Sequence, residues 1–325
     1  MRFKKPIFNP MTNSSHTYTL AFYNIENLFD IENDPKTNDD DFLPTSAKRW
    51  TIKRYQNKLR KLGSVISQIG DEKAISAPII VGLAEVENKN VIEDLINIST
   101  LKAEDYSFIH YDSSDERGID VALLYKSDSF QVEYSEVYSV YLQNDLGLRD
   151  FTRDILVVKG KLNHETLYIL INHWSSRREG EDETLYKRMA AATKAIEIIQ
   201  GIKVETPKAK IVVMGDFNDN PDSKSLLHLT KEGNLYNPFK TVWNKDEGSL
   251  NHNFKWNQFD QILISTNFFD PENTLTLQNA DVFNNKFLTQ YHGKYKGQPF
   301  RTYVGKKYKG GYSDHFPVYI QLKQS

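Results

Sequence analysis

The sequence contains no cysteine, which excludes disulfide bonds, thiolate metal sites and a cysteine nucleophile. No apolar run approaches the length of a membrane span, and no apolar segment follows Lys4 and Lys5 near the start. We therefore expect a soluble, cytoplasmic protein, or an exported one if a signal peptide has been removed. The formal net charge is only −2, so a polyanionic ligand would have to bind at a local basic patch.

Several common catalytic signatures are also absent. The sequence has no serine nucleophile elbow, no P-loop, no His-Glu-x-x-His zinc motif and no dinucleotide-binding glycine pattern. No such signature therefore competes with the polar residues that follow the predicted strands.

Aromatic residues are frequent, with 18 Tyr and 18 Phe, which favours a β-rich protein over a helical bundle. Two segments, Lys48–Ile69 and Thr184–Ile199, have helical composition, whereas many short apolar or alternating runs predict strands. This ratio indicates two packed sheets with helices outside. The predicted strands are Tyr18–Tyr23, Pro78–Ala84, Tyr106–His110, Val121–Tyr125, Ile155–Val158, Leu167–Ile171, Ile211–Met214, Gln261–Ile264 and Val318–Leu322.

Polar residues stand at the ends of these apolar runs from Asn24 to His315, so one site built from them needs nearly the whole chain. We therefore expect a single domain over residues 1–325. Residues 1–16 are expected to form a flexible N-terminal extension, and Asp30–Thr45, rich in Asp, Asn, Pro and Thr, predicts a surface loop.

The sharpest signal is a buried strand that ends in Gly215-Asp216-Phe217-Asn218. The carboxylate and the carboxamide are two residues apart on the same side, where Asp216 could bind a metal or orient water and Asn218 could bind a phosphoryl oxygen. Asp and Asn are also common turn residues, so an ordinary strand-to-turn exit is the alternative. Ser313-Asp314-His315, directly before an apolar strand, could add a metal ligand and an imidazole, or could be a surface turn.

Three further positions are weaker signals. Glu85 ends an apolar strand, where a charge is costly unless it is paired or bound to a metal. His173 ends another strand, and Asp260 begins one. A hydrogen-bonded histidine at the edge of the core is the default explanation for a single His of this kind.

Arg117 and Arg153 each precede a predicted strand, and a guanidinium matches the oxygens of a phosphate in a two-pronged fork. A salt bridge with a neighbouring Asp is the better explanation for either arginine alone. Taken together, however, acids, amides, two histidines and two arginines at successive strand ends are the groups that metal-assisted phosphoryl hydrolysis requires.

These segments, in this order, resemble the endonuclease/exonuclease/phosphatase superfamily, which includes deoxyribonuclease I. The segments Phe22–Asp30 and Arg117–Val121 resemble a branch found in Bacteroidetes-type bacteria. The resemblance implies an α+β fold, a four-layer α/β/β/α sandwich of two mainly antiparallel sheets. The matching pieces are Tyr23-Asn24-Ile25, Ala84-Glu85-Val86, Asn172-His173, Gly215-Asp216-Phe217-Asn218, Asp260 and Ser313-Asp314-His315.

The resemblance also implies a role for each matching residue. Glu85 would bind Mg²⁺ with help from Asn24 and Asp314, and Mn²⁺ is a possible substitute because the ligands are hard oxygens. Asp216 or His315 would act as the base, with Asp260 holding His315. Asn218 would hold the phosphate and His173 would assist the leaving group. Arg153 resembles a phosphate-contacting arginine, and Arg117 and Asp120 are further candidates.

The segment from Phe283 to Ser313 bears on the substrate because it has no acidic residue and leads directly into Asp314 and His315. Its cations alternate with aromatic residues, which suits phosphate neutralisation and base stacking. We expect Lys294, Lys296 and Arg301 to bind substrate, although a loop packed by its own tyrosines would have the same composition.

The expected function is Mg²⁺-dependent hydrolysis of a nucleic-acid phosphodiester, with no protein partner. A phosphatase or phospholipase C-like enzyme acting on an inositol phosphate, a sugar phosphate or sphingomyelin is the alternative. An inactive binding module on the same scaffold is a third possibility.

Overall fold

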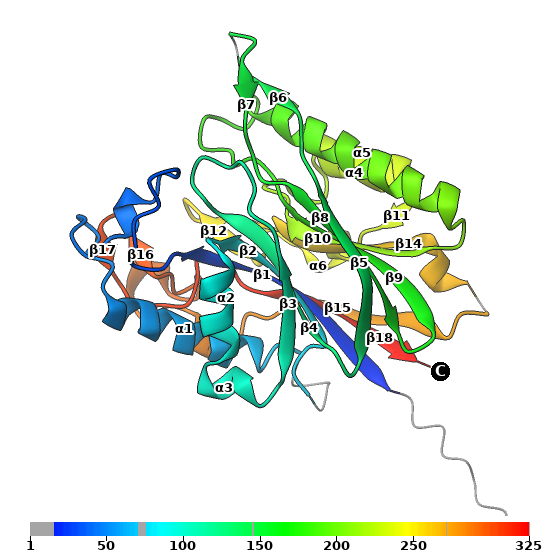
Figure 1. Ribbon diagram of the computed structural model, residues 1–325, viewed down its shortest axis with the longest axis horizontal. Coiled ribbons are helices and arrows are strands. Elements are labelled where there is room, and N and C mark those ends of the chain that lie inside the picture. Colours follow the sequence, from blue (N-terminus) through cyan, green and yellow to red (C-terminus); the bar gives the residue numbers. More distant parts are fainter. Residues whose placement is uncertain (1–15, 71–75, 145, 271, 325) are drawn as a thin grey trace, which may run out of the picture.

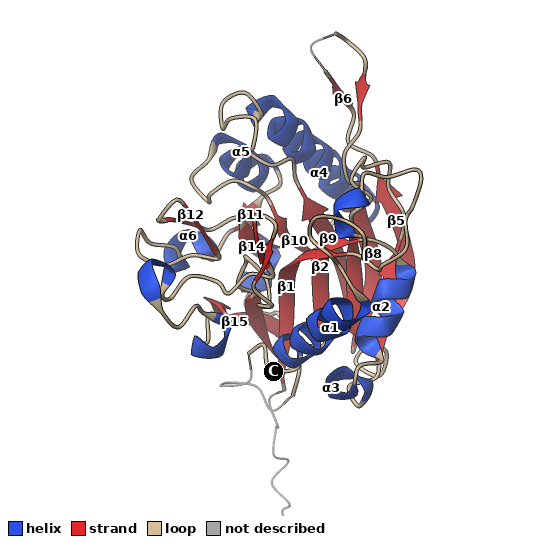
Figure 2. Ribbon diagram, turned by 90° about the vertical axis from the view of Figure 1, so that its left-hand side faces the viewer, coloured by secondary structure: helices blue, strands red, loops and turns tan. Residues whose placement is uncertain are grey.

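The computed structural model describes residues 16–70, 76–144, 146–270 and 272–324. Apart from His16, the extension expected over residues 1–16 lies outside these ranges. Two six-stranded sheets pack face to face, and helices cover their outer faces (Figure 1 and Figure 2). The predicted four-layer sandwich is confirmed.

The first sheet has the strand order β15-β18-β1-β2-β4-β3. Strands β1 and β2 pair in parallel, and every other neighbouring pair is antiparallel. The strands are β1 (Thr17–Leu28), β2 (Ile80–Val86), β3 (Tyr106–His110), β4 (Asp120–Lys126), β15 (Leu275–Val282) and β18 (Val318–Gln324).

The second sheet repeats this pattern in the order β11-β14-β10-β9-β8-β5, with β9 and β10 as its parallel pair. The strands are β5 (Phe130–Tyr138), β8 (Ile155–Leu162), β9 (Glu165–His173), β10 (Lys210–Asp216), β11 (Leu235–Tyr236) and β14 (Asp260–Ser265). Small hairpins are formed by β6 (Leu142–Gln143) with β7 (Arg149–Asp150), β12 (Leu250–His252) with β13 (Lys255–Asn257), and β16 (Tyr303–Val304) with β17 (Lys307–Tyr308).

Each parallel pair needs a crossover connection, and a helix supplies it. Helix α1 (Ile52–Ile66) lies between β1 and β2 in the chain, and α4 (Leu185–Glu205) lies between β9 and β10. The remaining helices are α2 (Lys89–Ile96), α3 (Ser99–Lys102), α5 (Lys224–Glu232) and α6 (Phe239–Val242), with short 3-10 turns η1 (Asp40–Phe42), η2 (Thr266–Phe269), η3 (Lys286–Leu288) and η4 (Gly293–Tyr295). No helix in the described ranges combines the length and the apolar character that crossing a membrane requires.

The side chains of strand β1 alternate between two apolar clusters, one on each face of the first sheet. Leu20 and Phe22 belong to the apolar cluster between the sheets, whereas Ala21 and Tyr23 belong to the cluster beneath α1 and α2. Successive side chains of a strand point to opposite faces, so a strand covered on both sides must be apolar at every position. This requirement explains the continuous apolar runs.

All nine predicted strands and both predicted helices are present. Sequence reasoning missed the edge strands β5 and β15, in which the described side chains are mostly exposed or half-buried and the apolar pattern is weak. The sequence also predicted only a surface loop over Asp30–Thr45. This segment carries η1, and it buries Asp39 and Phe42, whose ring stacks on Phe29 at a centroid distance of 4.4 Å.

Gly82 of β2 offers a test of the packing between the sheets. A Cβ atom there would lie 2.6 Å from Sδ of Met214 and 3.0 Å from Cδ2 of Phe22. We expect Gly82→Val to lower the free energy of unfolding by about 1–3 kcal/mol through overpacking, measured by urea denaturation. Combining it with Met214→Ala should cost less than the sum of the two single variants, because valine then fills space that methionine has vacated. Simple additivity would show that the two residues do not compete for this space.

Candidate active site

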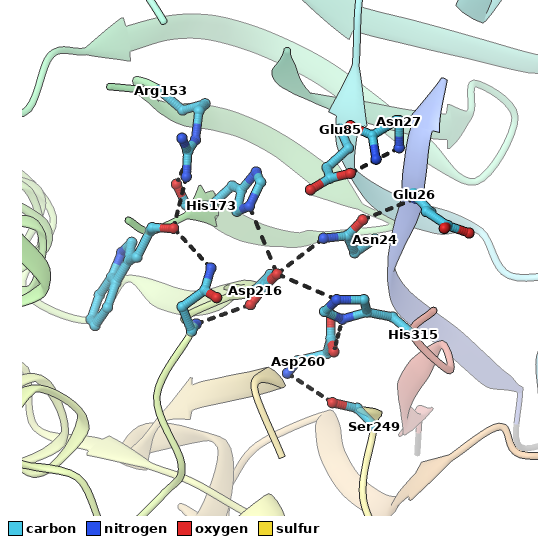
Figure 3. A network of polar contacts seen from close by, with 12 residues as sticks. Asn24, Glu26, Asn27, Glu85, Arg153, His173, Asp216, Ser249, Asp260 and His315 are labelled. Atoms are coloured by element: carbon cyan, nitrogen blue, oxygen red, sulfur yellow. Dashed lines mark hydrogen bonds and ion pairs between the residues drawn. The ribbon is translucent and has the colours of Figure 1, made fainter. Parts of the chain in front are cut away.

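The predicted site residues converge at one edge of the two sheets. Asn24 and Glu85 lie near the ends of the parallel strands β1 and β2, and His173 and Asp216 end the parallel strands β9 and β10. Asp260 begins β14, which pairs with β10 so that Asp260 stands opposite Asp216. Figure 3 shows these side chains pointing toward one another. His315, which lies shortly before β18 of the first sheet, completes the cluster.

Asp216 is the centre of this network, and its carboxylate is almost completely buried. Oδ2 accepts a 3.0 Å hydrogen bond from Nδ2 of Asn24, and Oδ1 accepts one of 2.9 Å from the backbone N–H of Asn218. Nε2 of His173 lies 3.7 Å from Oδ2, and Nε2 of His315 lies 3.9 Å from the same oxygen. Burial and, after it, repulsion from the Asp260 carboxylate raise the pKa of Asp216 to about 7, although His315 and the hydrogen bonds from Asn218 and Asn24 act in the opposite direction.

His315 and Asp260 form a buried imidazole–carboxylate pair. Nδ1 of His315 lies 2.7 Å from Oδ2 of Asp260, and the backbone N–H of Asp260 is held by the hydroxyl of Ser249 at 3.1 Å. Burial alone would lower the pKa of His315, but the Asp260 and Asp216 carboxylates raise it well above its usual value. The two carboxylates therefore favour the protonated form of His315.

His173 has the opposite electrostatic setting. Burial lowers its pKa well below the usual value, and the positive charges of Arg153, Arg117 and His315 lower it further. Its Nδ1 is buried and has no hydrogen-bond partner. The two histidines beside the Asp216 carboxylate thus have pKa values shifted in opposite directions.

Glu85 occupies a strained position at a bulge of β2. Its backbone φ is 67°, in the left-handed region that residues other than Gly rarely adopt. The strand register shifts between Ala84 and Val86. The bulge turns the carboxylate toward the site, where Oε2 accepts a 2.8 Å hydrogen bond from the N–H of Asn27. Oε1 lies 3.8 Å from Nη1 of Arg117, so this arginine faces a carboxylate.

Asp314 also faces an arginine. Its Oδ2 accepts a 2.7 Å bond from Nη2 of Arg301, and although burial would raise the pKa of Asp314, Arg301 and His315 lower it below its usual value. Arg301 additionally lies 3.4 Å from Oε1 of Glu26, a buried acid that sequence reasoning did not single out. Burial and the Asp314 charge raise the pKa of Glu26 to about 7.

A second buried network, also missed, supports Asn218. Asp219 follows it in the sequence and forms ion pairs with Arg177 and with Arg188, whose Nε lies 2.9 Å from Oδ2. Arg177 also donates to the backbone carbonyl of Asn218 at 2.6 Å. Asn218 itself is in the left-handed region at φ 50° and donates from Nδ2 to the carbonyl of Trp174 at 2.9 Å. These contacts hold the backbone N–H of Asn218 in the position from which it donates to Asp216. The phosphate contact predicted for the Asn218 side chain stays a prediction.

Arg153 is buried and already bound to protein acceptors. Its guanidinium donates to the carbonyls of His173 and Trp174 at 3.2 and 2.8 Å and to Asp115 at 2.8 Å. The salt-bridge alternative is therefore the one observed, although the partner is Asp115 rather than the adjacent Asp154. These contacts hold the chain that follows β9, and they do not support the predicted phosphate contact.

The remaining candidates lie around this centre. Asp120 is buried at the start of β4, where its Oδ2 lies 3.6 Å from Nε2 of His110. Lys294 and Lys296 are both exposed, as the prediction of substrate contacts requires. Most aromatic rings of the segment from Phe283 to Ser313 pack on the protein itself, as Tyr303 does against Trp50 at a centroid distance of 6.0 Å.

The side chains fit a divalent metal. Asp216, Asp260 and His315 have possible ligand atoms within 4.8 Å of one another, although His315 and Asp260 are already joined by their own 2.7 Å contact. Figure 3 shows the Glu85 carboxylate directed into the space beside His173, whereas Asn24 presents its Nδ2 to Asp216 and its Oδ1 accepts a 3.0 Å hydrogen bond from the N–H of Glu26. Carboxylate and amide oxygens are hard ligands, and the sequence offers no thiolate.

A model of the endonuclease/exonuclease/phosphatase family matches residues 19–324. The chain belongs to this family, whose members are phosphoric ester hydrolases. No match is found among curated proteins.

Solved structures with the same fold span nearly the whole chain. A family member from Bacteroides thetaiotaomicron has 16% identity and a TM-score of 0.62, covering 96% of this chain and 99% of that one. A mannosyl-6-phosphatase from the same organism has 16% identity and a TM-score of 0.59, with coverage of 94% and 99%. TDP2 of D. rerio, in complex with a single-strand DNA product, has 13% identity and a TM-score of 0.57, with coverage of 94% and 98%.

The contacts of Arg153 predict that its main role is structural. We expect Arg153→Ala to lower the free energy of unfolding by about 3–5 kcal/mol, because Asp115 would be left as a buried unpaired charge. Asp115→Ala should cost a similar amount, and the double variant should cost clearly less than the sum in denaturant titrations. An Arg153 variant of wild-type stability would instead favour a phosphate-binding role.

Proposed function

We propose that this protein is a Mg²⁺-dependent phosphodiesterase that hydrolyses nucleic-acid phosphodiester bonds by attack of water. The observation that carries the proposal is the buried Asp216 carboxylate, which is held by Asn24 and by the backbone N–H of Asn218 and has a histidine on each of two sides at 3.7 and 3.9 Å. A pKa of about 7 suits a general base at neutral pH, because the carboxylate is available and still basic enough to take a proton.

The opposite pKa shifts of the side chains suit each of them to a different role in the reaction. Asp216 accepts a proton from the attacking water while the new oxygen–phosphorus bond forms. His315, whose protonated form Asp260 favours, donates a hydrogen bond to a phosphate oxygen on which negative charge grows. His173, whose burial favours the neutral ring, can donate a hydrogen bond to the oxygen that leaves as the old bond breaks, and that oxygen takes its proton from solvent water. The raised pKa of His315 makes it the poorer base of the two candidates.

Glu85, Asn24 and Asp314 would hold the Mg²⁺ ion. A bound divalent cation neutralises charge on the phosphate and lowers the pKa of a coordinated water. Arg117 and Arg301 lie beside two of these acids, and they would keep the carboxylates ionised and in place.

Two observations favour a nucleic acid as the substrate. Exposed cations of the acid-free segment from Phe283 to Ser313 adjoin Asp314 and His315, and TDP2 of D. rerio, which shares the fold, is seen with a single-strand DNA product. A phosphomonoester is the second candidate, because the mannosyl-6-phosphatase has a comparable TM-score.

The deciding experiment is hydrolysis with Mg²⁺ and with a chelator, on supercoiled plasmid, single-stranded DNA, RNA, mannose 6-phosphate, an inositol phosphate and sphingomyelin. Cleavage of nucleic acid that disappears with the chelator would support the proposal. Release of phosphate from a monoester, without cleavage of any nucleic acid, would replace it by the second candidate.

Asp216→Asn should lower kcat by roughly 10²–10⁴-fold on bis(p-nitrophenyl) phosphate, because it removes the general base while keeping the side-chain shape. Asp260→Asn should lower kcat less, since His315 remains but loses the charge that keeps it protonated. Activity of Asp216→Asn within a few-fold of wild type would show that another group takes the proton. Ser67→Ala, a half-buried hydroxyl at the end of α1, is a control that should leave kcat unchanged.

The raised pKa of Asp216 also predicts a pH-dependent cost to stability. The folded protein holds this proton up to about pH 7, whereas the unfolded chain releases it near the ordinary aspartate pKa of 3.8, so the free energy of unfolding falls between these limits as pH rises. In chelator, Asp216→Asn should therefore be more stable than wild type at pH 8, and this advantage should shrink as pH falls toward 4. Thermal melting at several pH values measures the difference, and an advantage that does not change with pH would contradict the raised pKa.

A further inference from the structure

An exposed pair of aromatic rings lies where the hairpin of β12 and β13 meets the acid-free segment that precedes His315. Phe254 is 58% exposed and Tyr295 is 41% exposed. Their rings are nearly parallel, with an interplanar angle of 6° and centroids 5.5 Å apart. Nζ of Lys294 lies 4.9 Å from the Tyr295 ring centroid and 5.9 Å from that of Phe254. We call these three residues the aromatic platform.

Phe254 is in a backbone position that disfavours it. The pairing of His252 with Lys255 leaves Asn253 and Phe254 as a two-residue turn, and their φ values are 50° and 62°. Such a hairpin turn needs positive φ at both positions, and it normally carries Asn followed by Gly. A bulky side chain in the second position is strained and, being exposed, gains little from burial. Folding alone therefore does not explain a phenylalanine here.

The hairpin that carries Phe254 is joined directly to the catalytic centre. Leu250 forms a β-bridge with His315, and the N–H of Phe316 donates to the carbonyl of Ser249 at 2.7 Å. The Trp256 ring stacks on that of Phe316 at a centroid distance of 6.1 Å. Leu250 and Phe254 are four positions apart, which is at most about 14 Å at ~3.4 Å per residue, and the turn shortens this span. The platform is thus a short distance from the imidazole that would contact the phosphate.

We propose that the aromatic platform binds an unpaired base of a single-stranded nucleic acid that lies across the site. A base can stack on an exposed aromatic ring regardless of its identity, whereas bases inside a duplex are already covered by their neighbours. Lys294, together with the neighbouring Lys255 and Lys296, supplies positive charge for the flanking phosphates. The inference rests on the proposed phosphodiesterase activity and narrows its substrate class to single strands.

The test compares Phe254→Gly with wild type on three substrates: a single-stranded oligonucleotide, the duplex of the same sequence, and bis(p-nitrophenyl) phosphate, which is too small to reach the platform. We expect the KM for the single strand to rise roughly ten-fold or more. The KM values for the duplex and for the small ester should stay within two-fold of the wild-type values, because the catalytic groups are unchanged. The melting temperature should stay the same or rise, since Gly suits the turn.

Two variants control this comparison. Phe254→Trp should keep the wild-type KM, because it preserves a ring that can stack. Phe269→Ala removes an exposed ring that lies edge-on to Tyr236 at 5.1 Å, near the other end of β14, and it should change nothing. Fluorescence anisotropy of a labelled oligonucleotide in chelator measures binding without turnover, and there Phe254→Gly should lower the affinity by a similar factor.

The outcomes separate the two proposals. A protein that hydrolyses none of the esters would refute the phosphodiesterase, while the anisotropy measurement would still decide whether the platform binds single strands. An unchanged KM and an unchanged affinity in Phe254→Gly would refute the platform alone. A rise in KM for mannose 6-phosphate rather than for the oligonucleotide would show that the rings pack on a sugar, and it would overturn the single-strand assignment.

Discussion

The hydrogen bond from Asn24 to Asp216 joins the two sheets at the point where the site forms. Its partners are 192 residues apart in the chain and come from parallel strand pairs of different sheets. The bond is possible only because the apolar faces of β1 and β10 pack against each other between the sheets, with Phe22 and Met214 in the same cluster. The packing of many apolar side chains between the sheets thus positions the hydrogen bond between the Asn24 amide and the Asp216 carboxylate.

Buried charge is the main constraint on this edge of the sandwich. Four acids in this region each have an arginine neighbour: Arg117 at Glu85, Arg301 at Asp314, Arg188 at Asp219 and Arg153 at Asp115. Such pairs contribute little net stability, but loss of one partner is costly, so they favour a single arrangement of the loops. Asp216 is not among these pairs, and burial together with repulsion from Asp260 raises its pKa to about 7, where the group can exchange a proton near neutral pH.

The strongest sequence signals were those in which local pattern and burial agree. Strands covered on both faces were found because every position is apolar, whereas the edge strands β5 and β15 were missed because few of their described side chains are buried. Glu26, Asp115 and Asp219 were not recognised as parts of the site's support, since a buried acid and an exposed one look alike in a sequence. Phe254 was missed for a related reason: its unusual φ depends on a turn whose partner strand cannot be read from composition.

The sequence by itself determined the layered sandwich, the strand ends that carry Asn24, Glu85, His173 and Asp216, and the family to which they belong, because apolar periodicity and short motifs are local properties. Only the tertiary structure decided the pKa shifts of the two histidines and the partners of the arginines. It also decided the meeting of Phe254 with Tyr295. Burial, electrostatic neighbours and stacking all depend on which distant segments come together, and that follows from packing of the whole chain rather than from any one stretch of it.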